Sequence, residues 1–162
     1  MIPTRSQVGL VVIIGSALLL TSCQRALAIW LVPGSTANNL VLGISTSHDG
    51  TDKVQPEDIR VFPCDSIHRQ SDSGYYPGVD RAVWATAAPC DALPPPTNRA
   101  TYGQNLGALK PLRPLSSPGC YVVSAYARVD RDITEHGTMG FRIASDGTAT
   151  EMTRNELDDV FR

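Results

Sequence analysis

The chain has 162 residues, of which 42% are hydrophobic and 19% are charged, and its formal net charge is −2. This length fits one domain. The nearly balanced charge, with no basic run, excludes the electrostatic footprint of a protein that binds phosphate backbones, so we expect no nucleic-acid partner.

The first apolar segment of the chain follows a single cation. Arg5 precedes an uncharged run from Val8 to Leu20, which ends in the letters LTSC. A membrane-spanning helix needs about 20 apolar residues, so this run is too short to cross a bilayer. A positive start, a short apolar centre and small residues before a cut are typical of a signal peptide. We therefore predict a signal helix that is cleaved from the mature protein.

The end of this run resembles the lipobox of bacterial lipoproteins. Leu20, Thr21, Ser22 and Cys23 fill the four positions of that motif. The resemblance implies cleavage after Ser22, lipid on the Cys23 sulfur, and a lipid-anchored protein of the cell envelope. Two or three acyl chains give a durable anchor, since each buried methylene contributes about 0.8 kcal/mol. Gln24 is not the aspartate that retains lipoproteins in the inner membrane, so in a cell with two membranes we expect the outer one.

The lipobox divides the chain into four parts. These are a signal peptide at 1–22, a lipidated start and minimal tether at 23–25, a domain at 26–153 and a C-terminal tail at 154–162. The signal peptide contains one charged residue, Arg5, so the mature chain has 13 cationic residues against 16 anionic ones. Its membrane contact would be supplied by the lipid, with no need for a basic patch.

The domain is predicted to consist of short strands separated by turns rich in glycine and proline. The run CYVVSAYARV is the clearest strand, because β-branched and aromatic residues favour a pleated sheet. Asp146-Gly147 between the last two strands predicts a hairpin, and Asn155 is expected to cap one or two helical turns in the tail. The expected strands are 26–32, 39–46, 59–64, 82–88, 100–103, 120–129, 137–144 and 148–153.

Seven to eight short strands of this kind predict an all-β fold, an antiparallel β-sandwich whose two sheets share one core. The segments LSSPGCYVVSAYARV and GFRIASDGTAT resemble the closing strands of transthyretin-like and immunoglobulin-like domains. In those domains a Pro-Gly-x-Tyr turn opens a strand, and a strand containing phenylalanine follows. The resemblance implies the same sandwich architecture. Trp30 and Trp84 fall in predicted strands, and we expect both in the core.

Three cysteines remain once Cys23 carries lipid, which is enough for one disulfide and one thiol. A disulfide is permitted outside the cytoplasm, and the cysteine spacings match no zinc or redox motif. Cys64 ends one predicted strand and Cys120 begins another, and such ends lie side by side when the two strands run antiparallel. We therefore favour a Cys64–Cys120 disulfide, which leaves Cys90 as a loop thiol. A Cys64–Cys90 disulfide remains the open alternative.

The sequence contains no pattern that is typical of a catalytic or metal site. His48, His68 and His136 fall in predicted loops, far apart in the chain and without metal-ligand spacing. The acidic loop with Asp49, Asp52, Glu57 and Asp58 lacks the order of acids and glycine in a calcium-binding EF-hand. Serine-nucleophile and phosphate-loop motifs are absent as well. We expect no cofactor, no metal and no enzymatic activity.

One loop has the composition of a binding loop. Residues 68–82, HRQSDSGYYPGVDRA, contain Tyr75 and Tyr76 between glycines and a proline. Aromatic residues on loops are common recognition elements, although they also pack against their own domain. The sequence therefore predicts an envelope lipoprotein whose non-catalytic sandwich binds a protein or another extracytoplasmic ligand. The alternatives are a structural or accessory subunit of an envelope complex, joined through a sheet edge, and a small extracytoplasmic hydrolase.

Overall fold

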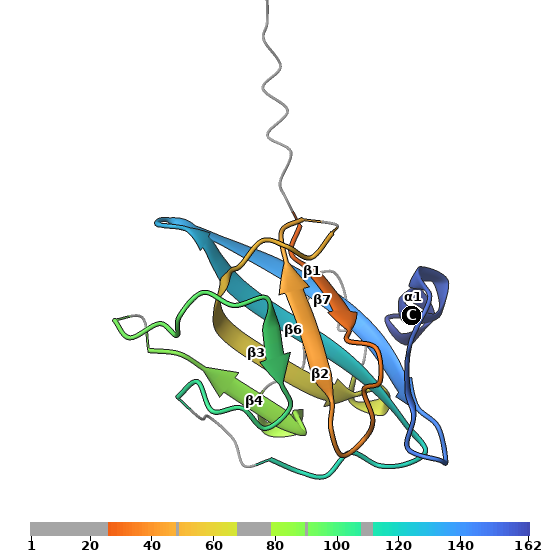
Figure 1. The fold of residues 1–162 in the computed structure, drawn as a ribbon. Coiled ribbons are helices and arrows are strands. Elements are labelled where there is room, and N and C mark those ends of the chain that lie inside the picture. The colour runs from red at the N-terminus through yellow and green to blue at the C-terminus, as the bar shows by residue number, and fades with distance from the viewer. Residues whose placement is uncertain (1–25, 48, 68–78, 90, 108–111) are drawn as a thin grey trace, which may run out of the picture.

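The computed structural model describes residues 26–47, 49–67, 79–89, 91–107 and 112–162, and these form two antiparallel β-sheets. One sheet has the strand order β1-β2-β5 and the other has the order β4-β3-β6-β7-β8 (Figure 1). The predicted all-β, antiparallel two-sheet fold is confirmed. The strands are β1 (Ala28–Leu31), β2 (Val41–Ser45), β3 (Gln55–Pro63), β4 (Trp84–Ala87), β5 (Arg99–Thr101), β6 (Gly119–Asp130), β7 (Ile133–Ile143) and β8 (Ala149–Glu151). The helical elements are η1 (Cys64–Ser66), η2 (Val79–Arg81) and α1 (Arg154–Val160).

The main core fills the space between the two sheets. Side chains alternate between the faces of a strand, so every second residue of β6 points inward. Val123 and Ala125 of β6 meet Leu42 and Ile44 of β2 in one buried cluster. Trp84 joins this cluster with 2% of its surface exposed, which confirms its predicted place in the core.

Backbone contacts tie the two sheets together along both sides of the sandwich. Thr36, in the turn between β1 and β2, pairs with Thr148 beside β8. On the other side Val54, just before β3, pairs with Thr97, just before β5. β1 also crosses closely over β7, because a Cβ placed at Gly137 would lie 2.2 Å from the Leu27 carbonyl oxygen. Backbone bridges therefore join the two sheets at one point on each side.

A second, smaller cluster lies on the outer face of the five-stranded sheet. Leu157 and Phe161, from α1 and its C-cap, pack there against Phe62 of β3 and Val122 of β6. Gly140 of β7 permits the approach, since a Cβ at this position would lie 3.0 Å from Leu157 Cδ1. The segment predicted as a C-terminal tail therefore contains a helix, α1, which covers part of the five-stranded sheet.

The start of α1 is fixed by a capping box. The Thr153 hydroxyl accepts a hydrogen bond from the Glu156 backbone N–H, and the Glu156 carboxylate accepts one from the Thr153 backbone N–H. That carboxylate also pairs with Arg142 of β7. The Thr153 backbone N–H and Arg142 lower the pKa of Glu156 to about 2. The prediction that Asn155 is the N-cap is wrong, because the capping hydroxyl belongs to Thr153.

Two strands begin earlier than the sequence predicts. β3 begins at Gln55 instead of residue 59 and contains a register shift between Pro56 and Asp58, where Glu57 forms an ion pair with Arg128. β7 begins at Ile133 instead of residue 137, because it pairs with β6 almost to the tip of their hairpin. In β3, cross-strand pairing overrides the low strand propensity of Pro56, Glu57 and Asp58.

Trp30 is half-buried and is not part of the main core, so its predicted place there is wrong. Its ring lies on the outer face of the three-stranded sheet, over Gly43 and Gly50. A Cβ at Gly43 would lie 1.9 Å from the indole ring. Glycine at this position therefore makes room for the tryptophan, which covers the backbone from outside.

Candidate functional site

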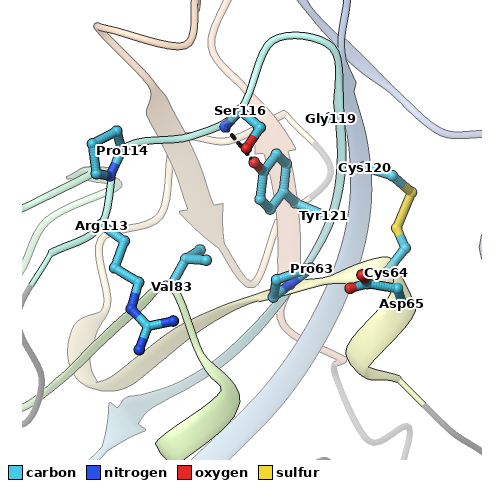
Figure 2. A pocket seen from close by; sticks show the side chains of 10 residues that line it. All are labelled: Pro63, Cys64, Asp65, Val83, Arg113, Pro114, Ser116, Gly119, Cys120 and Tyr121. Carbon is cyan, nitrogen blue, oxygen red and sulfur yellow. Dashed lines mark hydrogen bonds between the residues drawn. A yellow bond between two sulfur atoms is a disulfide. The ribbon is translucent and has the colours of Figure 1, made fainter.

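A pocket of about 570 Å³ lies at the end of the sandwich where β3 ends and β6 begins. Its walls come from the Pro63–Asp65 segment, from Val83 before β4, and from the chain that leads into β6 (Figure 2). Proline, valine and tyrosine supply the apolar part of the lining, and Arg113 and Asp65 supply charges. Pockets of about 300–1,000 Å³ with mainly apolar walls and a few polar groups are typical of small-ligand sites.

The disulfide between Cys64 and Cys120 forms one wall of this pocket. The two Cα atoms lie 5.4 Å apart, because Pro63 and Tyr121 are direct partners in the antiparallel β3–β6 pair. The favoured pairing is confirmed, and the alternative with Cys90 is not the one in the structure. The covalent bond joins the end of β3 to the start of β6 at the pocket itself.

Hydrogen bonds hold the chain segment that forms the opposite wall. The Tyr121 hydroxyl accepts a hydrogen bond from the Ser116 backbone N–H (Figure 2). The Arg113 backbone N–H donates to the Val83 carbonyl at 3.0 Å, and the Arg113 carbonyl accepts from the Tyr102 hydroxyl at 2.7 Å. This wall is therefore positioned by groups of three different strand regions, without use of the Arg113 side chain.

The two charged residues of the pocket are exposed at its rim. Arg113 belongs to the chain that leads into β6, and Asp65 belongs to η1. Neither side chain forms an ion pair with another of the described residues. A guanidinium and a carboxylate are thus both accessible to a ligand that lies on the apolar floor between them.

Of the three histidines, only His136 lies among the described residues. It lies in β7, so the prediction that it is in a loop is wrong. Its ring centroid lies 4.5 Å from that of Tyr126, its cross-strand partner. Its Nε2 atom lies 3.1 Å from the hydroxyl of Ser124, which is buried. Burial lowers the pKa of His136, so the neutral imidazole dominates at pH 7.

The acidic segment is split between a loop and a strand. Asp49 accepts hydrogen bonds from Thr51, and Asp52 accepts one from Thr46. Glu57 and Asp58 lie in β3, so the expectation of a single acidic loop is wrong. Within the described parts of the chain, no three His, Cys, Asp or Glu side chains gather closely enough to hold a metal ion.

Several residues singled out from the sequence lie outside the residues that the structure describes. These are Ser22, Cys23, His48, His68, Tyr75, Tyr76 and Cys90. The segment with the two tyrosines connects η1 to η2 in the sequence. Within the described ranges, no helix has the length and apolar character needed to span a membrane.

Comparison with family models, with curated proteins and with solved structures gives no match to this chain. The site must therefore be interpreted from its own geometry. The sequence drew attention to Cys64 and Cys120 but not to the pocket beside them. Pro111 and Pro114, on either side of Arg113, indicate an extended segment. They are the one local sequence signal for this segment, which forms a wall of the pocket.

Proposed function

We propose that this protein is a lipid-anchored, non-catalytic binding protein of a bacterial cell envelope. The lipobox at Leu20 to Cys23 supports the anchor, and the pocket beside the Cys64–Cys120 disulfide supports the binding role. The observation that carries the proposal is their placement: Leu27, just before β1, lies against Gly137 in the middle of β7, away from the pocket where β3 ends and β6 begins.

The short tether gives this placement a consequence for orientation. Four residues, Gln24 to Leu27, separate Cys23 from β1. An extended chain spans at most about 3.6 Å per residue, so lipid on Cys23 would hold the start of β1 within roughly 20 Å of the bilayer. Leu27 lies over Gly137, which pairs with Ala125, and six residues of β6 lead from there to the pocket at Gly119. At about 3.3 Å per residue, the pocket lies roughly 20 Å along β6 from the point where the tether enters the domain.

Hydrogen bonds beside the strand edges favour this proposal over a subunit that joins a complex by sheet extension. Partner strands add to a sheet where a row of backbone groups is unpaired. Here the Thr36–Thr148 and Val54–Thr97 pairs tie the sheets together along both sides. Beside β4, the Thr86 hydroxyl accepts a hydrogen bond from the Leu106 N–H, and the Val83 carbonyl just before the strand accepts one from the Arg113 N–H. A pocket or a sheet face is then the more accessible route to a partner.

Replacing Cys23 with alanine should abolish lipidation and leave the signal peptide attached, because the sulfur of this residue receives the lipid in the lipobox. The intact mass of the protein extracted from membranes measures both changes. The wild-type chain should begin at Cys23 and carry acyl mass, and so should a Cys90→Ala variant, which leaves the lipobox unchanged. A Cys23→Ala chain that is still cut after Ser22 and released in soluble form would contradict the proposed anchor.

A photoreactive amino acid at Pro114 should form adducts in intact cells, since Pro114 lines the pocket on the side away from the tether. The matched control carries the same group at Asp146, an exposed turn residue between β7 and β8 that lies outside the pocket. Mass spectrometry of the purified protein detects a protein or a small molecule attached at either position. Adducts that form equally at both positions, or at neither, would exclude the pocket as the binding site.

A further inference from the structure

Among the described residues, α1 and its C-cap cover only part of the outer face of the five-stranded sheet. The apolar cluster beneath α1 contains Phe62 and Val122, which are register partners in β3 and β6. Two residues further from the pocket along each strand, the partners are Arg60 and Ser124, and after two more they are Asp58 and Tyr126. Along the same strands the surface therefore changes from apolar side chains under α1 to polar ones, of which Ser124 is buried and the Arg60 side chain is 30% exposed.

Ion pairs and hydrogen bonds fix the polar side chains of this part of the sheet. Arg60 donates two hydrogen bonds to Asp58 from its Nε atom, at 2.9 and 3.1 Å. Arg128 donates from Nε to Glu57 at 2.8 Å, and the Thr134 hydroxyl donates to the second Glu57 oxygen at 3.0 Å. The side chains of both arginines remain 30% exposed. They present an ordered set of donors and acceptors, so a ligand would not have to restrict their motion.

An aromatic ring lies in the middle of this polar surface. Tyr126 is 38% exposed, and its ring rests against the ring of His136 at a centroid distance of 4.5 Å and an interplanar angle of 31°. The imidazole is held from below by the buried Ser124 hydroxyl. Asp58 and His136 are the cross-strand partners of Tyr126 on its two sides. The ring is therefore supported on one side and open to solvent on the other.

We propose that this surface, which we name the Tyr126 face, binds a neutral saccharide. A sugar ring presents an apolar face of C–H groups, which stacks on an aromatic ring, and a rim of hydroxyls, which bond to both carboxylates and guanidinium groups. The Tyr126 face consists of Glu57, Asp58, Arg60, Tyr126, Arg128 and His136.

The charge of the Tyr126 face selects this ligand class over charged ones. Its two carboxylates each pair with a guanidinium, so the charges cancel within the surface. His136 adds no charge at pH 7, because burial lowers its pKa. A polyanion such as nucleic acid gains its affinity from unpaired cations, and this surface offers none among the described residues of the face. A neutral ligand with many hydroxyls uses the paired charges without breaking them.

Calorimetric titration of the full protein, purified in detergent, tests the proposal. The probes are three neutral hexasaccharides: cellohexaose, maltohexaose and chitohexaose. We expect at least one of them to bind. Tyr126→Ala should weaken its affinity tenfold or more, whereas Tyr126→Phe should keep the affinity within threefold of the wild-type value. Ile133→Ala is the matched control, since Ile133 is 49% exposed and lies in β7 outside the face.

The outcomes separate this proposal from a merely structural role for Tyr126. A thermal melt of each variant shows whether the fold is kept, and Arg60→Gln supplies a second variant on the same face. If none of the three hexasaccharides binds the wild-type protein, the proposal is overturned. It is equally overturned if one binds with the same affinity to Tyr126→Ala, or if only a protein or an anionic polymer binds this face. The test does not depend on the pocket or on lipidation, so it is independent of the proposed function.

Discussion

Removing the Cys64–Cys120 disulfide is expected to lower the free energy of unfolding by about 4 kcal/mol. The two residues are 56 positions apart, so the bond closes a long loop in the unfolded chain. In the chain-entropy model, the loss of this constraint gives the unfolded state many more conformations. Because a whole domain is typically stable by about 5–15 kcal/mol, the loss is a large part of the total.

Urea denaturation of a Cys64→Ala, Cys120→Ala double variant measures this effect. Trp84 is buried in the core, so its fluorescence reports the unfolding of the sandwich. A Cys90→Ala variant serves as the control for removing a thiol without opening the bridge. A loss below about 1 kcal/mol would show that loop closure contributes little here, against the chain-entropy estimate.

The cysteine pairing was predictable because it depends on a simple property of antiparallel strands. The end of one strand lies next to the start of its partner, and the segments IRVFPC and CYVVSAYARV place a cysteine at each of these ends. The hairpin at Asp146-Gly147 was predictable for a similar reason. Gly147 has a φ of +87°, a conformation that glycine adopts without strain, so a local sequence signal specifies the turn.

The start of β3 was not predictable from local sequence. Pro56, Glu57 and Asp58 have low strand propensity, yet all three belong to the strand. Their conformation depends on Arg128 and Thr134, which lie more than 70 positions away and bind the Glu57 carboxylate. Interactions at this separation exist only after the sheet has formed, so no short window of the sequence contains them.

The pocket and the Tyr126 face were missed because each depends on sheet register. Tyr126 and His136 come from different strands, and a shift of one residue in the β6–β7 register would place them on opposite faces. The pocket likewise brings Asp65 and Arg113 together through the β3–β6 pair and the chain leading into β6. Sequence patterns identify the strands, but they do not specify which residues lie opposite each other.

The covered part of the outer sheet face and the Tyr126 face are linked through β6. Val122 lies under α1, whereas Tyr126, four residues further along, is open to solvent. The helix therefore confines the exposed surface to the part of the sheet away from the pocket. With lipid on Cys23, a saccharide on this face and a ligand in the pocket would bind to different regions of one anchored domain.

Replacing Phe141 with alanine is expected to lower the free energy of unfolding by about 3–5 kcal/mol. Phe141 is fully buried in β7, and its ring stacks on that of its cross-strand partner Tyr121 at a centroid distance of 5.3 Å. The change removes apolar contacts and leaves a cavity beside Tyr121. Because the Tyr121 hydroxyl holds Ser116 in the pocket wall, the same change should also loosen that wall.

Two companion variants separate these consequences. Phe141→Leu keeps most of the buried volume and should cost less than about 1.5 kcal/mol, whereas Tyr121→Phe keeps the ring stack and removes only the hydrogen bond to Ser116. Denaturation of all three gives the stabilities, and hydrogen exchange of the Ser116 amide measures the wall. Exchange should be fast in Tyr121→Phe and in Phe141→Ala but slow in Phe141→Leu. Slow exchange in Tyr121→Phe would mean that the hydroxyl does not hold the wall, and that packing alone shapes the pocket.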